Sequence, residues 1–171
     1  MDEEKLRAEE VEILRPEIKD LEAVFGFWRA QHELHYNLDP VYYKPNSPEL
    51  DTLAREYFQK TITTDSPHIL IARFQDKIVG FVTFEEKGTG SGIEAFASNL
   101  SSYEEVIDFF IEDKFRGRNV GAHLMTKAQE HCQNACLPNM KVEVAASNTG
   151  AQRFYERLGF GVKQVEMFKK I

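Results

Sequence analysis

The chain has 171 residues, of which 42% are hydrophobic and 29% are charged, a size and composition that fit one globular domain. Its formal net charge of -7 argues against nucleic acid as the principal partner, because phosphate backbones select basic surfaces. No apolar run approaches the roughly 20 residues of a membrane span, and the start of the chain lacks the features of a signal peptide, so we expect no membrane association and a cytoplasmic protein.

The chain is expected to consist of a charged arm over residues 1–10 and a single domain over residues 11–171. The first half of this domain contains two predicted helices and three predicted strands. Apolar residues at helical spacing predict a helix from Glu17, and the pair Ser47-Pro48 predicts the start of a second one. Runs rich in β-branched and aromatic residues predict strands. The strands expected here are 11–15, 68–74 and 78–86, the last two forming a hairpin.

The second half begins with the glycine-rich stretch 87–92, which lacks a nucleotide-binding spacing and is expected to be a connector. Helices are expected from Val120 to about Ala135 and from Ala151 to Leu158. Buried or alternating runs predict three more strands, at 106–111, 141–146 and 162–168. This order predicts an α/β fold with a mixed central sheet of six to seven strands and about four helices on both faces.

Cysteine and histidine give no sign of a disulfide scaffold or a metal centre. Cys132 and Cys136 lie four residues apart in an expected helix, a geometry poorly suited to a disulfide, so we interpret them as two small, semi-buried thiols. His32 and His35 lie one helical turn apart, but the sequence offers no matching set of further ligands. We therefore expect no metal.

The stretch FRGRNVGAHLM, residues 115–125, joins an expected strand to the start of an expected helix. The first turn of a helix has unpaired backbone N–H groups and the positive end of the helix dipole, which together bind phosphate. Gly117, Gly121 and Ala122 keep side chains away from the backbone, and Arg116 and Arg118 add positive charge to an acidic protein. This stretch predicts an anion site, unless the arginines are merely solvated.

The same residues resemble the R-x-x-G-x-G/A motif of the GNAT superfamily of acyl-CoA-dependent N-acetyltransferases. A second block follows in the right order, because Asn148, Ala151, Phe154-Tyr155 and Gly159-Phe160 resemble N-x-x-A-x-x-F-Y-x-x-x-G-F. Asn119 stands where the family usually has a glycine, and Asp113 where it often has a proline. Neither departure removes a backbone donor, since Asn accepts positive φ readily.

The resemblance implies acetyl-CoA as co-substrate, no metal, and a set of coenzyme-binding residues. In the family, main-chain groups of the fourth strand contact the pantetheine arm, the loop amides bind the diphosphate, and residues of the second block complete the site. The positions implied here are Phe109, Phe110, Ile111, Glu112, Arg116, Gly117, Arg118, Asn119, Val120, Gly121, Ala122, Asn148, Phe154 and Tyr155.

Two catalytic residues are also implied by the resemblance. Tyr155 matches the tyrosine that protonates the departing coenzyme sulfur, and a phenol is a reasonable acid for a thiolate. An acceptor amine must lose a proton to attack. Glu105 aligns with a glutamate that serves as base in one branch of the family, although Glu104 and Asp108 are equally plausible by chemistry.

The acceptor pocket of this fold is usually built from the first two helices and their connection. The aromatic and acidic residues in that region are His35, Tyr36, Asp39, Tyr42 and Tyr43. An acidic, aromatic wall would favour a cationic amine, although tyrosines in such a place are often only packing residues.

We therefore expect an N-acetyltransferase that moves acetyl from acetyl-CoA to a primary amine, in a small molecule or a peptide, by direct attack in a ternary complex. It would act as a monomer or homodimer. The alternatives are a non-catalytic acyl-CoA-binding or regulatory module on the same fold, or a nucleotide-binding protein that uses the same helix end for another phosphate.

Overall fold

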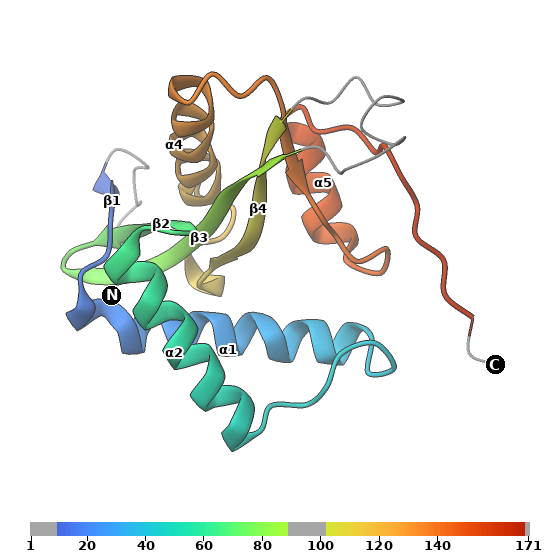
Figure 1. The fold of residues 1–171 in the computed structure, drawn as a ribbon, viewed down its shortest axis with the longest axis horizontal. Helices are drawn as coiled ribbons and strands as arrows, with labels where there is room; N and C mark the ends of the chain where they lie inside the picture. Colours follow the sequence, from blue (N-terminus) through green and yellow to red (C-terminus); the bar gives the residue numbers. More distant parts are fainter. Residues whose placement is uncertain (1–9, 89–101, 170–171) are drawn as a thin grey trace.

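The computed structural model describes residues 10–88 and 102–169, which build one twisted sheet with strand order β1-β2-β3-β4-β5 (Figure 1). Neighbours are antiparallel from β1 to β4, whereas β4 and β5 are parallel. The strands are β1 Glu12–Leu14, β2 His68–Phe74, β3 Lys77–Gly88, β4 Ser102–Ile111 and β5 Met140–Val142. The mixed sheet is confirmed, but the predicted six to seven strands are wrong, because five form in the described part of the chain.

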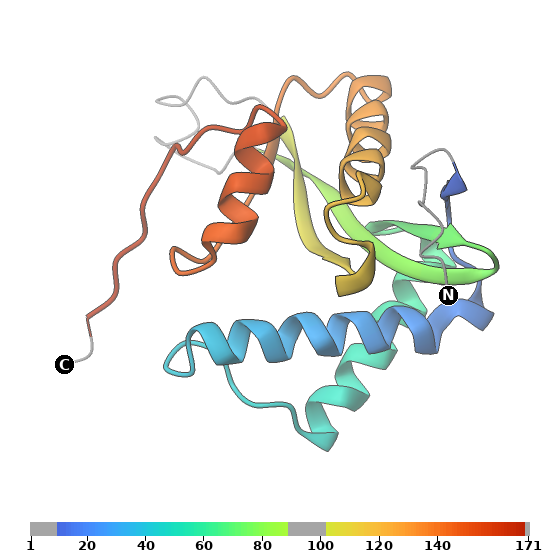
Figure 2. The same ribbon diagram turned by 180° about the vertical axis from the view of Figure 1, so that it is seen from behind.

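Helices cover both faces of this sheet, as predicted (Figures 1 and 2). Helices α1 (Leu21–Leu38) and α2 (Pro48–Thr64) lie on one face, and α4 (Val120–Asn134) and α5 (Thr149–Arg157) lie on the other. Short 3-10 turns precede α1 at Ile18–Asp20 and follow β4 at Asp113–Phe115. No helix among the described residues is long and apolar enough to cross a bilayer.

Local signals in the sequence explain where the helices begin. The Ser47 hydroxyl accepts a hydrogen bond from the Leu50 amide at 3.2 Å, and Pro48 occupies the first helical position of α2. The Asn148 side chain caps α5 in the same way, accepting from the Ala151 amide at 3.1 Å. The start at Ser47-Pro48 was predicted from these residue types and is confirmed, whereas α5 begins at Thr149, two residues before the predicted Ala151.

The sheet separates two hydrophobic clusters. One joins strand residues such as Val82 and Val106 to Leu124 and Met125 of α4, and the other joins Phe81 to the side chains of α1 and α2. Seven consecutive residues of β3, from Ile78 to Phe84, are buried because both faces of this central strand are covered. The clusters hold α1 and α4 on opposite sides of the central strands.

An irregularity in β4 shapes the edge of the sheet. Val106 pairs with Phe84 and Asp108 pairs with Thr83, so Ile107 is an extra residue and forms a β-bulge. Because of this extra residue, the side chains that face α4 are even-numbered before the bulge and odd-numbered after it. Glu104 and Val106 face α4 before the bulge, and Phe109 and Ile111 face α4 after it. Parallel pairing with β5 ends at Val106, at the same point. A gap therefore opens between β4 and β5 from the bulge onward.

Two strand predictions in the last third of the chain need correction. The predicted strand 141–146 pairs only over Met140–Val142, because β4 has turned away beyond that point. The predicted strand 162–168 is extended but pairs with no described strand, and Val165 and Met167 are 74% and 90% exposed. A β-type sequence without a neighbouring edge cannot form a ladder. The glycine-rich connector at 87–92 lies mostly outside the described residues.

Candidate functional site

The loop between β4 and α4 presents a row of free backbone donors. Asn119 has φ 64° and Gly117 has φ 72°, so two left-handed residues turn the chain into the first turn of α4. The loop's backbone hydrogen bonds are donated by Phe115, Arg116 and His123. Within the described part of the chain, the N–H groups of residues 117–122 therefore have no acceptor. This arrangement can bind the oxygens of a phosphate group.

The basic side chains of this loop divide into two kinds. The Arg116 Nε donates to the Ile111 carbonyl at 2.9 Å, and its NH1 lies 2.8 Å from Asp113 Oδ1, so this side chain fastens the loop to the end of β4. Lys114 pairs with Glu112 at 3.2 Å. Arg118 makes no ion pair within residues 10–88 and 102–169, which leaves its charge available to an anionic ligand.

Main-chain groups of β4 face the gap at alternate residues beyond the bulge. The Glu112 amide donates to the Val79 carbonyl at 2.9 Å, so the N–H of Glu112 points toward β3. Because N–H directions alternate along a strand, the N–H of Phe110 also points toward β3. The N–H groups of Phe109 and Ile111 consequently point to the side from which β5 has departed. Of the four strand positions expected to contact a pantetheine arm through the main chain, these two have amides directed to the gap.

The α4 side of the gap is lined by packed aromatic rings. Phe109 stacks on Phe154 of α5 with ring centroids 5.2 Å apart, and Tyr155 lies 6.1 Å from Phe109. A Cβ on Gly121 would lie 3.1 Å from Phe109 Cζ and 3.3 Å from the Phe154 ring, so this glycine lets α4 approach the pair. The structure thus brings together Phe109, Gly121, Phe154 and Tyr155.

Tyr155 is a buried phenol that holds its proton at neutral pH. It is 9% exposed, and burial raises the pKa of its phenol above the usual value because the phenolate would lose its hydration. The hydroxyl stays protonated at neutral pH. Asn148, about two turns before it, uses its Oδ1 to cap α5, which leaves its side-chain N–H2 as the group able to contact a ligand.

The three carboxylates considered as bases lie in different surroundings. Glu105 is held by Lys141 at 2.8 Å, an ion pair that also raises the pKa of Lys141. Glu104 is fully buried on the α4 face, where its Oε2 lies 3.4 Å from His131 Nδ1. Asp108 is 9% exposed and lies directly after the bulge.

Asp108 has the surroundings of a proton acceptor. Burial raises its pKa to about 6, although a hydrogen bond of 2.8 Å from the Thr83 hydroxyl opposes this shift. Burial raises the pKa of Tyr57 in α2 to about 12, and the nearby Asp108 carboxylate adds to this shift, so Asp108 lies on the α1/α2 face. The resemblance pointed to Glu105, chemistry alone did not rank the three acids, and Thr83 was missed. The signal was present: a hydroxyl within the otherwise apolar run IVGFVTF.

The aromatic residues expected at the acceptor side form a connected group. The Tyr43 ring lies 5.1 Å from His35 and 4.9 Å from Tyr42, and Tyr42 lies 5.5 Å from Phe168 of the C-terminal segment. Asp39 Oδ1 accepts from the Val41 and Tyr42 amides at 3.1 Å. Desolvation raises the pKa of Tyr43, with further contributions from Tyr42, Asp39 and Glu143, and burial lowers the pKa of His35. Among the described residues, Tyr36 makes no ring contact with this group.

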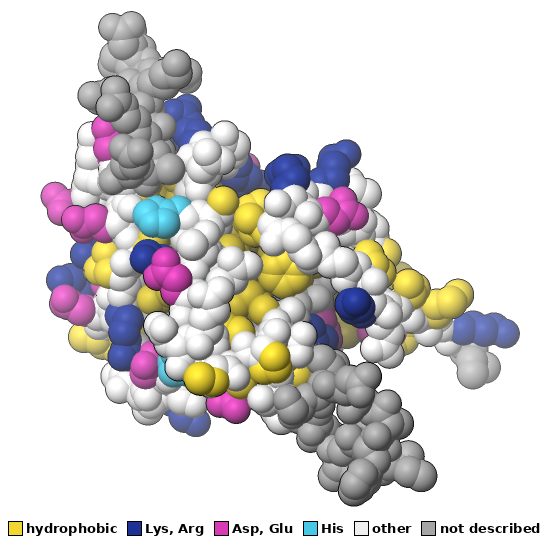
Figure 3. Space-filling view, turned by 90° about the horizontal axis from the view of Figure 1, so that it is seen from above, with side chains coloured by type: hydrophobic (Ala, Val, Ile, Leu, Met, Phe, Trp, Pro, Cys, Tyr) yellow, Lys and Arg dark blue, Asp and Glu magenta, His cyan; other side chains and the backbone are white. Residues whose placement is uncertain are grey.

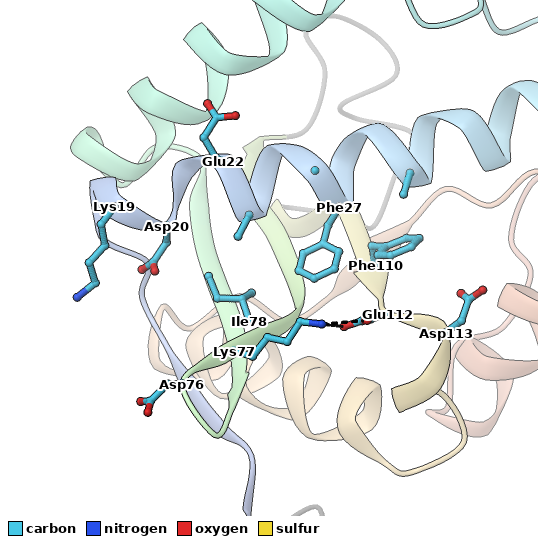
Figure 4. A pocket seen from close by; sticks show the side chains of 13 residues that line it. Lys19, Asp20, Glu22, Phe27, Asp76, Lys77, Ile78, Phe110, Glu112 and Asp113 are labelled. Carbon is cyan, nitrogen blue, oxygen red and sulfur yellow. Dashed lines mark hydrogen bonds and ion pairs between the residues drawn. The ribbon is translucent and has the colours of Figure 1, made fainter.

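A cavity of about 770 Å³ lies between α1 and the ends of β3 and β4 (Figure 4). Phe27 and Phe110 form its apolar wall, with rings 5.7 Å apart, and Lys77 and Glu112 pair at its edge. It shares Phe110 and Glu112 with the expected coenzyme site but contains no part of the loop 116–122. Seen from above, apolar side chains are also exposed in the middle of the molecule, between the positions of α4 and α5 (Figure 3).

Among the described residues no group of three His, Cys, Asp or Glu side chains is placed to hold a metal ion. His32 Nε2 instead lies 2.8 Å from the Lys44 carbonyl. Both cysteines are free thiols, with Cys132 buried and Cys136 exposed.

Residues 28–160 match the acetyltransferase (GNAT) family. An uncharacterized N-acetyltransferase of Methanocaldococcus jannaschii is 29% identical over 141 residues, covering 81% of this chain and 57% of that protein. A second one, from Archaeoglobus fulgidus, is 28% identical over 109 residues, covering 59% of this chain and 65% of that protein. The chain thus spans about three fifths of the length of these relatives.

Solved structures share the fold at low sequence identity. A Bacillus halodurans protein superposes with a TM-score of 0.83 at 17% identity, covering 94% of this chain and 99% of that one. The PaiA N-acetyltransferase of Thermoplasma acidophilum, solved in complex with coenzyme A, superposes with a TM-score of 0.70 at 17% identity, covering 91% and 92%. The strand gap and the loop of free amides thus lie in a fold shared with a coenzyme A complex.

Proposed function

The chain belongs to the GNAT family of acetyltransferases, and from this premise we propose that it transfers an acetyl group from acetyl-CoA to a primary amine in a ternary complex. The observation that carries the proposal is the row of unpaired N–H groups at residues 117–122, beside a strand edge whose amides are also free. A row of loop amides suits a diphosphate, and a strand edge suits the amides of a pantetheine arm.

The coenzyme would be held by groups on both sides of the gap. Backbone N–H groups of residues 117–122 and the Arg118 side chain take the diphosphate. The amides of Phe109 and Ile111 take the pantetheine arm, and one of them polarises the acetyl carbonyl. The Phe109–Phe154 pair and Gly121 form the apolar wall on the α4 side.

Proton transfer would involve two side chains on opposite faces of the strand. Asp108 takes a proton from the amine, whose nitrogen then forms a bond to the acetyl carbon as the carbon–sulfur bond breaks. The departing sulfur takes a proton from Tyr155, and the second proton that the nitrogen loses as the amide forms returns through solvent to the Tyr155 phenolate. A carboxyl with a pKa of about 6 is ionised at pH 7 yet basic enough to accept a proton, so we favour Asp108 over Glu105, which is held by Lys141.

The acceptor would enter from the α1/α2 face, where Asp108 lies. The aromatic group of His35, Tyr42 and Tyr43, with Asp39 and Glu143 nearby, lies on this side and favours a cationic ligand. This arrangement supports an amine acceptor, whether a small molecule or the amino group of a peptide.

The experiment that tests the proposal measures thiol release from acetyl-CoA with a panel of amines: n-butylamine, 1,4-diaminobutane, glycinamide and lysine amide. Calorimetry of acetyl-CoA binding accompanies it. We expect binding together with amine-dependent thiol release. Binding without release for every amine would support a non-catalytic acyl-CoA-binding module, and ATP binding as tightly as acetyl-CoA would support a general nucleotide site. No binding at millimolar acetyl-CoA would contradict the whole assignment.

A further inference from the structure

Helix α1 crosses the strands of the sheet one after another, and two contacts fix its position. At its start, Asp20 pairs with Arg73 of β2 at 3.1 Å. Seven residues later, Phe27 packs against Phe110 of β4, with ring centroids 5.7 Å apart (Figure 4). Seven helical residues advance about 10 Å, which matches two strand spacings of about 4.8 Å. The helix therefore advances by about one strand for every turn.

The next inward-facing position lies past β4, where the gap opens. Val24, Phe27 and Gln31 follow each other on the sheet-facing side of α1, and Gln31 lies about 6 Å beyond Phe27 along the helix axis. In both ribbon views the C-terminal half of α1 extends past β4 (Figures 1 and 2). Farther along, His35 packs on Tyr43, which lies near Glu143 just after β5. Gln31 thus falls between the contacts to β4 and those to the β5 side.

Gln31 is a buried polar side chain with an unused acceptor. It is 8% exposed, and its Oε1 has no hydrogen-bond partner within the described residues. A buried amide oxygen without a donor is costly, and most buried polar side chains find a partner. An apolar residue would pack better here in the ligand-free protein. The position and the unused oxygen together indicate a donor that arrives with a ligand.

We propose that Gln31 belongs to the acceptor site and that its Oε1 accepts a hydrogen bond from the attacking amino group. This inference rests on the proposed acetyl transfer. Two donors could reach the gap, an amide of the pantetheine arm and the acceptor amine. Gln31 and Asp108 both lie on the α1/α2 face, whereas the coenzyme loop leads into α4 on the other face. The amine, which must approach Asp108, is therefore the donor that Gln31 meets.

The test compares three variants: Gln31→Met, which removes the acceptor at similar volume, Gln31→Glu, which keeps it and adds a charge, and Gln59→Met on the exposed side of α2 as a matched control. For each protein, KM and kcat are measured with the best amine of the panel, together with the acetyl-CoA dissociation constant and the thermal midpoint of the ligand-free protein.

We expect Gln31→Met to raise KM for the amine about tenfold or more, because a hydrogen bond to a polar or charged nitrogen is lost, while the acetyl-CoA dissociation constant stays within twofold. The same variant should raise the thermal midpoint by about 3 °C, because no unsatisfied oxygen remains buried. Gln31→Glu should bring KM back near the wild-type value but lower the midpoint, since it buries a charge. Gln59→Met should leave all four quantities unchanged.

Several results would overturn the inference. One is a KM for the amine within twofold of wild type in Gln31→Met. Another is a weakened acetyl-CoA affinity with unchanged KM, which would assign Gln31 to the pantetheine arm instead. A lowered midpoint in Gln31→Met would show a structural role alone. If the wild-type protein turns over none of the amines, the proposed function fails separately. Gln31 is then tested by thermal protection with coenzyme A and 1,4-diaminobutane, and equal protection of wild type and Gln31→Met would reject the site.

Discussion

At the scale of single residues, burial gives two side chains opposite tasks. Burial raises the pKa of both Asp108 and Tyr155, because each would carry its charge in a poorly hydrated place. For Asp108 the result is a carboxylate that accepts a proton near neutral pH. For Tyr155 it is a phenol that keeps its proton throughout the physiological range. One type of environment thus supplies a base on one face of β4 and an acid on the other.

Asp108→Asn should abolish the proton acceptor and leave coenzyme binding intact. We expect kcat to fall about a hundredfold or more, because general base catalysis typically contributes 10²–10⁴-fold. In the wild-type protein kcat should rise as pH increases through about 6, and this rise should be missing in the variant. The measurement is a pH profile of kcat for both proteins, with Glu105→Gln as control. A larger loss in Glu105→Gln would transfer the role to Glu105.

The same substitution should stabilise the protein above pH 6. The folded-state pKa of Asp108, about 6, exceeds its ordinary value of 3.8, so ionised Asp108 costs stability above pH 6, and this cost disappears as pH falls below about 4. Asn carries no such cost. We expect Asp108→Asn to gain about 2–3 kcal/mol at pH 8, with the gain shrinking between pH 6 and pH 4 in urea unfolding curves. A gain independent of pH would refute the burial argument.

Tyr155→Phe should slow the reaction without loosening the coenzyme. We expect kcat to fall about a hundredfold, since the departing sulfur loses its proton donor, while the acetyl-CoA dissociation constant stays within twofold. Because burial raises the pKa of the phenol, the wild-type profile should show no loss of activity from Tyr155 up to pH 9. Tyr103→Phe is the matched control. An unchanged kcat in Tyr155→Phe would leave Tyr155 as a packing residue.

At the scale of elements, sequence signals were reliable where they act locally and failed where an element depends on a neighbour. Ser47-Pro48 begins α2 through a hydrogen bond within four residues, so the sequence was sufficient to predict this start. The run 162–168 has strand-forming side chains, but pairing depends on an available edge. No glycine near Ile107 indicates the bulge in the sequence. Consequently the faces on which Asp108 and Phe109 lie could not be assigned from the sequence.

Gly121→Ala tests how closely α4 must approach the gap. The new Cβ would lie 3.1 Å from Phe109 and 3.3 Å from Phe154, so the rings or the helix must move by a few tenths of an ångström. We expect a stability loss of about 1 kcal/mol and weaker acetyl-CoA binding, measured by calorimetry. Gly26→Ala in α1 is the contrast: its Cβ meets nothing within 4 Å, so it should gain about 0.5–1 kcal/mol. Equal effects of the two would contradict the packing argument.

At the scale of the whole molecule, a net charge of -7 surrounds a loop with local positive charge. Arg116 is engaged with Asp113 and Ile111, whereas Arg118 remains without an ion pair among the described residues. The net negative charge of the protein repels a phosphorylated ligand at long range, and the positive charge of the loop attracts it at short range. Coenzyme affinity should therefore depend strongly on the few charges of the loop.

Raising NaCl from 50 to 500 mM should weaken acetyl-CoA binding, because salt screens an exposed arginine–phosphate attraction. We expect Arg118→Ala to bind more weakly at low salt and to show a flatter salt dependence, in calorimetric titrations. S-acetylpantetheine, which lacks the diphosphate, should show little dependence on salt with either protein. A salt dependence that is the same in wild type and Arg118→Ala would place the diphosphate elsewhere.

The extra residue at Ile107 also decides where a change of length would be felt. Deleting Ile107 itself would restore simple alternation and keep Asp108 opposite Thr83 and Phe109 beneath α4, because Asp108 would then directly follow Val106. Deleting a residue between Asp108 and Ile111 would instead turn the remainder of the strand over, moving its side chains to the opposite layers. The cost of a single-codon deletion should therefore be small at Ile107 and large a few positions later.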